Sequence, residues 1–426
     1  MKKIREEIKE KIDEQWNEQL TFLQTIGRYK STFGNEAPLQ EYLEEYFADK
    51  MQLETKKIFP NIKKMSNSPG FSPVDWGYKG RPVIIGTWGA AGNKTGKSLI
   101  LQSHIDVVPE GPLENWDYNP WEPKIKGNRM YGRGIQDMKS GMAAMVFAVR
   151  ALQSLGIKPQ ANVYLESVIE EEITGNGALT TLLSGYKADA ALIPEPFGQN
   201  GVIAQVGVIW LNVRVKGAAA NMENSNSAVS AIEKAYILIK ALQDYRKYIN
   251  SLSKHPAFED HSHPLSVNIG KINGGEWTSS VASECTFDVR VGLYPGKSPQ
   301  DIKDEVYKWL MKAAKRDEWL KENIPEITYY GFHAEGAELD KNNDLFKALE
   351  KSHYQTTNKE MDYIAITATT DIRFFNNYYN IPATCYGAEG SNMHGANEWV
   401  DLDSLKLVSE TYANFILDWC DAQKFN

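Results

Sequence analysis

The sequence predicts an α/β protein in which a mixed, mostly parallel sheet lies between layers of helices and a smaller α+β domain is inserted into the chain. Short apolar runs alternate with helical stretches up to residue 206, which is typical of parallel βα units. The pattern then changes to strand, helix, strand, strand, helix, and α/β character returns near Tyr329. A chain of 426 residues is also long enough for two or more domains.

The N-terminal part supplies the predicted elements in order. Two amphipathic helices come first and a Ser-, Pro- and Gly-rich loop follows them. Apolar runs bounded by Gly, Pro or Asn then predict buried strands, and a further helix follows the glycines at 132 and 134. These elements are helices at 5–29 and 37–50, a loop at 66–80, strands at 83–88, 98–101 and 163–168, and a helix at 141–155.

The inserted domain is predicted at residues 207–325, which leaves 1–206 and 326–426 to form one main domain around it. A final helix at 403–418 completes that main domain. Within the insertion we expect strands at 208–216, 265–272 and 285–292 and helices at 228–245 and 299–316.

Composition argues against several classes of protein. The net charge of −8 and the lack of a long basic run argue against nucleic acid as a partner. No stretch of about 18 apolar residues predicts a membrane span, and the charged N-terminus does not resemble an export signal. The three cysteines, Cys285, Cys385 and Cys420, are isolated, so we expect reduced buried thiols and a cytoplasmic protein.

The first candidate site residues follow the apolar run at 98–101. His104 and Asp106 are two positions apart, so in an extended chain their side chains share one face. His104 is a candidate metal ligand and Asp106 is placed to orient it. An H-x-D pattern alone is weak, because a core histidine is the commoner meaning.

Other carboxylates and one histidine stand at similar places. Asp137 follows two glycines and precedes a helix, where it could equally be a helix cap. The acidic cluster at 170–172 contains Glu171 and Glu172 and could be a solvated turn. Glu195 follows another short apolar run, and His394 lies in a glycine-containing loop near the C-terminus.

Taken together, these residues predict a two-metal centre. The carboxyl ends of parallel strands meet at one edge of a sheet, so ligands placed there converge. Two zinc ions carry a charge of +4, which Asp137, Glu172, Glu195 and one hydroxide would neutralise. We expect zinc, with cobalt or manganese as alternatives.

The motifs around these residues resemble the di-zinc family of aminoacylase, acetylornithine deacetylase, succinyl-diaminopimelate desuccinylase and carboxypeptidase G. The resemblance runs from about Glu36 to the last helix. Its most specific parts are SHIDVVP at 103–109, GRGIQDMKSG at 132–141, EEEITGNGA at 170–178, TDIR at 370–373 and MHG at 393–395.

The resemblance implies a zinc-exopeptidase-like core with a ferredoxin-like lid and dimerisation domain. It implies that His104, Asp137 and Glu195 hold one zinc. It also implies that Asp137, Glu172 and His394 hold the other. Family members with glutamate at the position of Glu195 are typically deacylases or carboxypeptidases.

The resemblance further implies that Glu171 is the general base, that Asp106 orients His104 and that Arg373 contacts the substrate. Arg373 favours a substrate carboxylate, although it could serve an amide carbonyl or a structural acid instead.

One part of the family pattern is missing. The family usually has a histidine after the first strand of the inserted domain, where it reaches the partner's active site and stabilises the oxyanion. This chain reads GAAAN at 217–221, so Asn221 stands there and is a candidate oxyanion donor. An unusual substrate, a different donor or lost activity are the rival explanations.

The predicted function is hydrolytic removal of an acetyl, succinyl or formyl group from the nitrogen of a small polar molecule. A dipeptidase or carboxypeptidase with the same metals, and a catalytically silent zinc-binding protein, are the alternatives. A homodimer through the inserted domain is expected. The HSH stretch at 261–263 is expected to be an exposed loop and not a metal site.

Overall fold

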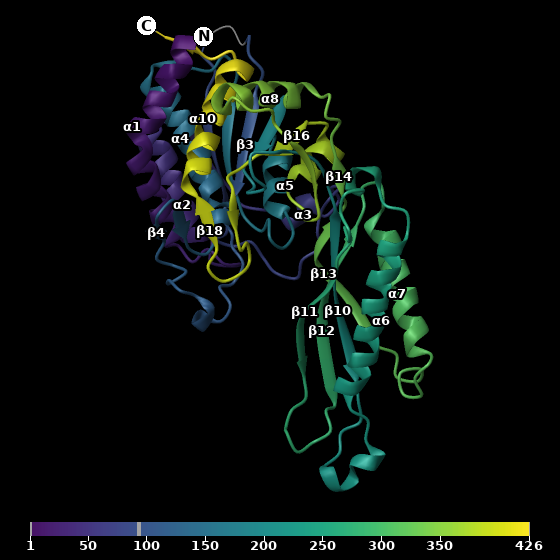
Figure 1. Cartoon of the computed structure of the whole chain (residues 1–426). Helices are drawn as coiled ribbons and strands as arrows, with labels where there is room; N and C mark the ends of the chain where they lie inside the picture. Colours follow the sequence, from purple (N-terminus) through teal and green to yellow (C-terminus); the bar gives the residue numbers. More distant parts are fainter. Residues whose placement is uncertain (1, 92–94, 426) are drawn as a thin grey trace.

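The computed structural model describes residues 2–91 and 95–425, and it shows a main domain from which a second domain projects (Figure 1). The main domain is built around a six-stranded sheet in the order β1-β2-β7-β3-β8-β16. These strands are β1 (Glu54–Ile58), β2 (Val83–Trp88), β3 (Leu99–His104), β7 (Val163–Val168), β8 (Ala190–Ile193) and β16 (Ala383–Cys385).

Four neighbouring strands of the six pair in parallel. β7, β3, β8 and β16 run in one direction, and β2 is antiparallel to β7. Every residue of β3 is buried, because this strand has a neighbour on each side and helices over the sheet faces. A continuous apolar run is what such a strand requires. The predicted α/β fold class is therefore confirmed.

Helices lie on both sides of the sheet (Figure 1). On one side α4 packs between β3 and the helices α1 and α10, so all of α4 is buried except Arg150, Gln153 and Ser154. On the other side α3 contacts α5, and α5 contacts β2 and β7. The helices of the main domain are α1 (Lys2–Gly27), α2 (Ala37–Glu45), α3 (Ile62–Met65), α4 (Ser140–Ser154), α5 (Asn176–Leu183), α8 (Asp344–Thr357), α9 (Ile372–Phe374) and α10 (Leu402–Trp419).

Short strands complete the main domain in three smaller sheets. Their orders are β14-β9-β15, β17-β18-β5-β4 and β19-β6. The strands are β4 (Lys124–Lys126), β5 (Arg129–Tyr131), β6 (Ile157–Lys158), β9 (Gly201–Gln205), β14 (Ala337–Glu338), β15 (Tyr363–Ile366), β17 (Gly390–Ser391), β18 (Trp399–Asp401) and β19 (Gln423–Lys424).

The inserted domain has one antiparallel sheet in the order β11-β12-β10-β13, with two helices over one face. Along β10 apolar side chains alternate with polar ones, so Leu211 and Val213 join the core beneath the helices while Asn212 faces the other way. The elements are β10 (Gly207–Lys216), α6 (Ala231–Ser251), β11 (Val267–Gly274), β12 (Glu284–Leu293), α7 (Pro299–Ala314) and β13 (Glu326–Ala334).

The end of this sheet corrects the predicted domain boundary. We expected the insertion to end at residue 325, but β13 begins at Glu326 and pairs with β10 along the inserted sheet. The predicted boundary was wrong because the residues around Tyr329 have a pattern typical of the α/β main domain. The hydrogen bonds to β10 place residues 326–334 in the inserted sheet instead.

Two contacts between the domains come from β13 and from the loop that precedes β11. The backbone N–H of His333 donates to the Ser72 hydroxyl over 3.2 Å. His261 Nε2 lies 2.9 Å from the Ala365 carbonyl oxygen. The HSH loop at 261–263 therefore rests in part on the main domain, with Ser262 and His263 exposed as expected.

Cys285, Cys385 and Cys420 are free and buried, as expected. Across residues 2–91 and 95–425 none of the helices has the length and apolar character needed to cross a bilayer.

A buried polar pair joins the two central strands. Gln102 of β3 lies beside Glu166 of β7 and donates to its carboxylate over 2.8 Å, and the Thr181 hydroxyl donates to the same oxygen over 2.9 Å. Glu166 is fully buried, and this burial raises its pKa from 4.5 to about 7. The folded protein therefore holds this proton more tightly than the unfolded chain.

This shift predicts how the substitution Glu166→Gln depends on pH. Ionisation of Glu166 destabilises only the folded state, so the wild type loses stability as pH rises from 4.5 to about 7. A neutral glutamine has no such loss, so Glu166→Gln should gain roughly 1–3 kcal/mol relative to wild type between pH 5 and pH 8. Urea unfolding at both pH values measures this difference. The exposed Glu41→Gln is the control, and an equal effect of Glu166→Gln at both pH values would refute the assignment.

Candidate metal centre

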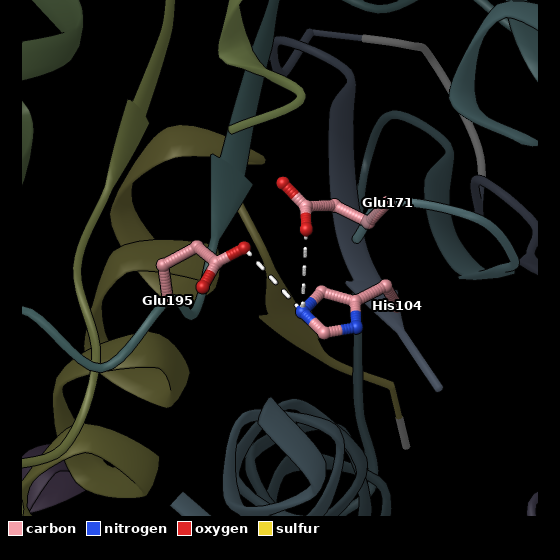
Figure 2. A group of neighbouring side chains, drawn as sticks. All are labelled: His104, Glu171 and Glu195. Carbon is pink, nitrogen blue, oxygen red and sulfur yellow. Dashed lines mark ion pairs between the residues drawn. The ribbon is translucent and has the colours of Figure 1, made fainter. Parts of the chain in front are cut away.

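The candidate site lies at the carboxyl end of the parallel strands, where His104 ends β3. Its Nε2 atom is 3.2 Å from Asp137 Oδ1, 3.6 Å from Glu195 Oε1 and 3.9 Å from Glu171 Oε2. Figure 2 shows the imidazole of His104 facing the carboxylates of Glu171 and Glu195. Glu195 comes shortly after β8, the strand next to β3, so the parallel sheet brings these residues together.

Asp137 is shared by two histidines. Its Oδ1 faces His104, while its Oδ2 lies 3.2 Å from Nε2 of His394. The same His394 nitrogen is 3.1 Å from Glu172 Oε1. The carboxylate thus links two adjoining groups of nitrogen and oxygen atoms that are candidate metal ligands, one around His104 and one around His394. Such histidine and carboxylate sets suit zinc and other divalent transition metals.

The electrostatics of the cluster fit a bound cation. Burial, followed by repulsion from Glu195, raises the pKa of Glu171 well above its usual range. Burial also raises the pKa of Glu195. Asp137 is buried too, yet hydrogen bonds from His104 and His394 lower its pKa. A divalent cation would compensate this excess of buried carboxylates.

Asp106 contacts His104 more closely through its backbone oxygen than through its carboxylate. Nδ1 of His104 lies 2.9 Å from the backbone oxygen of Asp106 and 3.8 Å from its carboxylate. The carboxylate instead accepts hydrogen bonds from the backbone N–H groups of Glu171 and Glu172, over 3.2 and 3.1 Å. The carbonyl orients the imidazole, and the carboxylate fixes the acidic turn. An H-x-D spacing does not separate these two roles.

The acidic turn contains a third glutamate with a different environment. Glu170 is fully buried and accepts from Trp76 Nε1 and from the Tyr78 hydroxyl, both over 2.8 Å. The Arg81 guanidinium lies 2.6 Å from the same carboxylate. The Arg81 guanidinium therefore balances the charge of Glu170, which supports the turn. Glu171 and Glu172 face the cluster instead.

Arg373 is buried away from solvent, and only 1% of it is exposed. Its guanidinium donates to the Thr174 carbonyl over 2.7 Å and lies against the Phe374 ring. It supports the turn that follows Glu172. These contacts use only part of the guanidinium, so the expected contact with the substrate stays a prediction.

Asn221 lies far from the cluster within its own chain. β10 starts beside the main domain at Gly207 and ends at Lys216, a length of about 30 Å. Asn221 comes five residues later and bridges to Ser280 near the remote end of the sheet. It is exposed, and its side-chain oxygen accepts from the backbone N–H of Asn224 over 3.0 Å.

Sequence reasoning missed Glu398, which holds the loop that carries Asp137. Its buried carboxylate accepts from the backbone N–H groups of Gly134, Gln136 and Asp137 over 2.9 to 3.1 Å. The guanidinium of Arg133 donates to the same carboxylate. No motif marks this residue, because its partners are mostly backbone groups from a distant segment.

This arrangement predicts that Glu398→Gln weakens metal binding while the fold persists. One oxygen becomes an N–H donor that faces other donors, so the Asp137 loop shifts. Loss of such support typically lowers metal affinity about 10- to 100-fold. Competition with a chelator measures the affinity for zinc, and circular dichroism checks the fold. The exposed Glu389→Gln is the matched control, and unchanged zinc affinity in Glu398→Gln would reject the supporting role.

Comparison with known proteins identifies the family. The family model described as peptidase family M20/M25/M40 matches residues 100–418. N-formyl-4-amino-5-aminomethyl-2-methylpyrimidine deformylase from Halalkalibacterium halodurans is 27% identical over 444 aligned residues, which cover 98% of each protein. The enzyme of the same name from Bacillus subtilis is 27% identical over 384 residues, 84% of this chain and 88% of that protein.

Solved structures share the fold. The dipeptidase Dug1p from Saccharomyces cerevisiae has a TM-score of 0.79 and 15% identity, and the match covers 99% of each chain. At this identity the likeness shows the fold alone. The family match confirms the resemblance seen in the motifs: the chain belongs to peptidase family M20/M25/M40.

Proposed function

We propose that this amidohydrolase removes a formyl group from the nitrogen of a small amine, with two divalent metal ions in its site. The proposal of two metal ions is supported by the Asp137 carboxylate, whose two oxygens face His104 and His394. The formyl group is proposed because two relatives are named as deformylases of an aminomethylpyrimidine.

Five side chains would hold the metals. His104, Asp137 and Glu195 would hold one ion, and Asp137, Glu172 and His394 the other. Three ligand carboxylates contribute −3 against +4, so the loaded cluster favours one further anionic ligand and avoids a large buried charge. Zinc is the ion we propose, because nitrogen and carboxylate ligands in this number suit it.

When bound, two such cations lower the pKa of a coordinated water and polarise the scissile carbonyl. Glu171 would then act as the general base. Its carboxylate lies 3.9 Å from His104 Nε2, farther than those of Asp137 and Glu195. There it can accept the proton of the attacking water and donate it to the departing nitrogen.

Glu171 and Glu172 form a matched pair for testing these roles. Glu171→Gln should keep two metal ions per chain and lose about 10²- to 10⁴-fold in kcat, because only proton transfer is removed. Glu172→Gln should lose metal itself. Metal content and release of formate from N-formyl-4-amino-5-aminomethyl-2-methylpyrimidine are the measurements. Full activity in Glu171→Gln would reject the base.

The same assay separates the substrate classes. Acetylornithine, succinyl-diaminopimelate and a set of dipeptides are compared with the formyl substrate by kcat/KM. A higher kcat/KM for a dipeptide would replace the deformylase by a dipeptidase with the same metals. Bound zinc with no turnover of any amide would instead support a silent binding protein.

We also propose a homodimer through the inserted domain. Met222, Ile232 and Trp277 are 51%, 45% and 73% exposed, and they line one cavity near the remote end of the inserted sheet. Pairing with a second copy would cover these apolar side chains. It would also carry Asn221 toward the partner's metal centre.

Asn221 would then donate its amide N–H to the oxyanion in the partner subunit. Asn221→Ala should lower kcat by about 10²- to 10³-fold. Mixing Asn221→Ala with Glu171→Gln tests the exchange, since a mixed dimer has one site with both an intact Glu171 and the partner's Asn221. Activity that returns on mixing supports the role, whereas unchanged kcat in Asn221→Ala alone rejects it.

The cytoplasm is the proposed compartment. The three cysteines are free and buried, with none paired in a disulfide among the described residues. Reduced thiols of this kind are typical of cytosolic proteins.

A further inference from the structure

The open face of the inserted sheet carries a cavity of about 200 Å³ that none of the roles above uses. It lies on the side away from α6 and α7, toward the end of the sheet that adjoins the main domain. Its lining residues come from all four strands of this sheet. They are Trp210, Asn268, Gly270, Lys271, Asp288, Val289, Arg290 and Tyr330.

Aromatic rings form one wall of this cavity. The Trp210 ring lies 5.7 Å from the Tyr330 ring and 5.2 Å from the ring of Phe332, against which it packs edge-on. Trp210 also packs on Val208 and Ala334, away from the main core of the inserted domain. An aromatic wall fixed in this way can stack on a planar ring.

Polar groups accompany the rings. Trp210 Nε1 is buried and has no hydrogen-bond partner among the described residues. Asp288 accepts from Asn212 over 2.7 Å through Oδ1 and also accepts from the Tyr330 hydroxyl. Burial and the Asp288 charge raise the pKa of Tyr330, so its hydroxyl stays neutral. The cavity thus offers the Asp288 carboxylate as an acceptor for an amino group.

The cavity adjoins the acidic turn of the metal centre. Gly331, next to Tyr330, has a backbone φ of +59°, and a Cβ atom there would lie 2.7 Å from the Trp210 ring and 3.3 Å from the Ile173 carbonyl. Ile173 directly follows Glu172. Arg290, on the cavity wall, lies 3.4 Å from the Thr367 carbonyl of the main domain. Trp210 is therefore separated from the turn by a single glycine.

We infer that this cavity binds the amine portion of the substrate as a planar, amino-substituted nitrogen heteroaromatic ring, with Trp210 as the stacking residue and Asp288 as the acceptor for the ring amino group. This inference rests on the proposed function, since the ring is the amine portion of the substrate that this function requires. It makes Trp210 a specificity-determining residue.

Binding of the product amine tests the cavity independently of turnover. The probe is 4-amino-5-aminomethyl-2-methylpyrimidine, titrated by calorimetry into the full-length, zinc-loaded Glu171→Gln protein. Adding Trp210→Ala should weaken this binding about 5- to 100-fold, because stacking on an aromatic side chain contributes that much per ring. Trp210→Phe should recover part of it. Tyr307→Ala, an exposed aromatic on α7 beyond the other sheet face, is the matched control.

Asp288→Asn tests the polar contact. It should weaken binding of the amino-substituted ring more than binding of the same ring without its 4-amino group. Equal losses for both rings, or unchanged binding in Trp210→Ala, would overturn the inference.

Turnover separates this inference from the proposed reaction. Trp210→Ala should lower kcat/KM for the formylated ring substrate at least tenfold more than for N-formylbutylamine, which has the same bond and no ring. Binding of the ring without hydrolysis of any formamide would support the proposed ring-binding cavity and reject the proposed deformylase activity. Hydrolysis with the same ratio in wild type and Trp210→Ala would keep the deformylase and remove the cavity.

Discussion

The position of the Asp137 carboxylate is the constraint on which the rest of the site depends. One oxygen faces His104 and the other faces His394, so a single side chain joins a residue from the central sheet to a residue from a late loop. Buried carboxylates gather around it, and burial and mutual repulsion oppose their ionisation. A pair of divalent cations would balance this charge, with the same oxygens as candidate ligands.

A second set of buried carboxylates keeps this arrangement in place. Glu398 holds the Asp137 loop through backbone N–H groups, and Asp106 holds the acidic turn in the same way. Glu170 reaches the Arg81 guanidinium and two aromatic donors. These residues face the backbone that carries the ligands, so their effect on a metal would come through position and not through contact.

The inserted domain offers different chemistry at its two ends. Its remote end exposes apolar side chains such as Trp277 near Asn221, which suits contact with a second copy. At its near end, Gly331 lies between the Trp210 ring and the acidic turn. A ten-residue strand, β10, connects the two, so one rigid sheet could serve the partner's site and its own.

The sequence alone determined the α/β class, the presence of an inserted domain and the residues that gather at the sheet edge. Apolar runs identify the buried parallel strands, and the carboxyl ends of such strands meet at one edge of the sheet. Tertiary structure decided the rest. Pairing with β10 places residues 326–334 in the inserted sheet. The Arg373 guanidinium donates to a backbone carbonyl, and the Asp106 carboxylate accepts from the backbone of the acidic turn. Glu398 could not be predicted from the sequence, because its partners are mostly backbone N–H groups. Each of these outcomes depends on hydrogen bonds to backbone groups that are distant in sequence. Every residue carries the same backbone groups, so the sequence does not show which of them will be the partner.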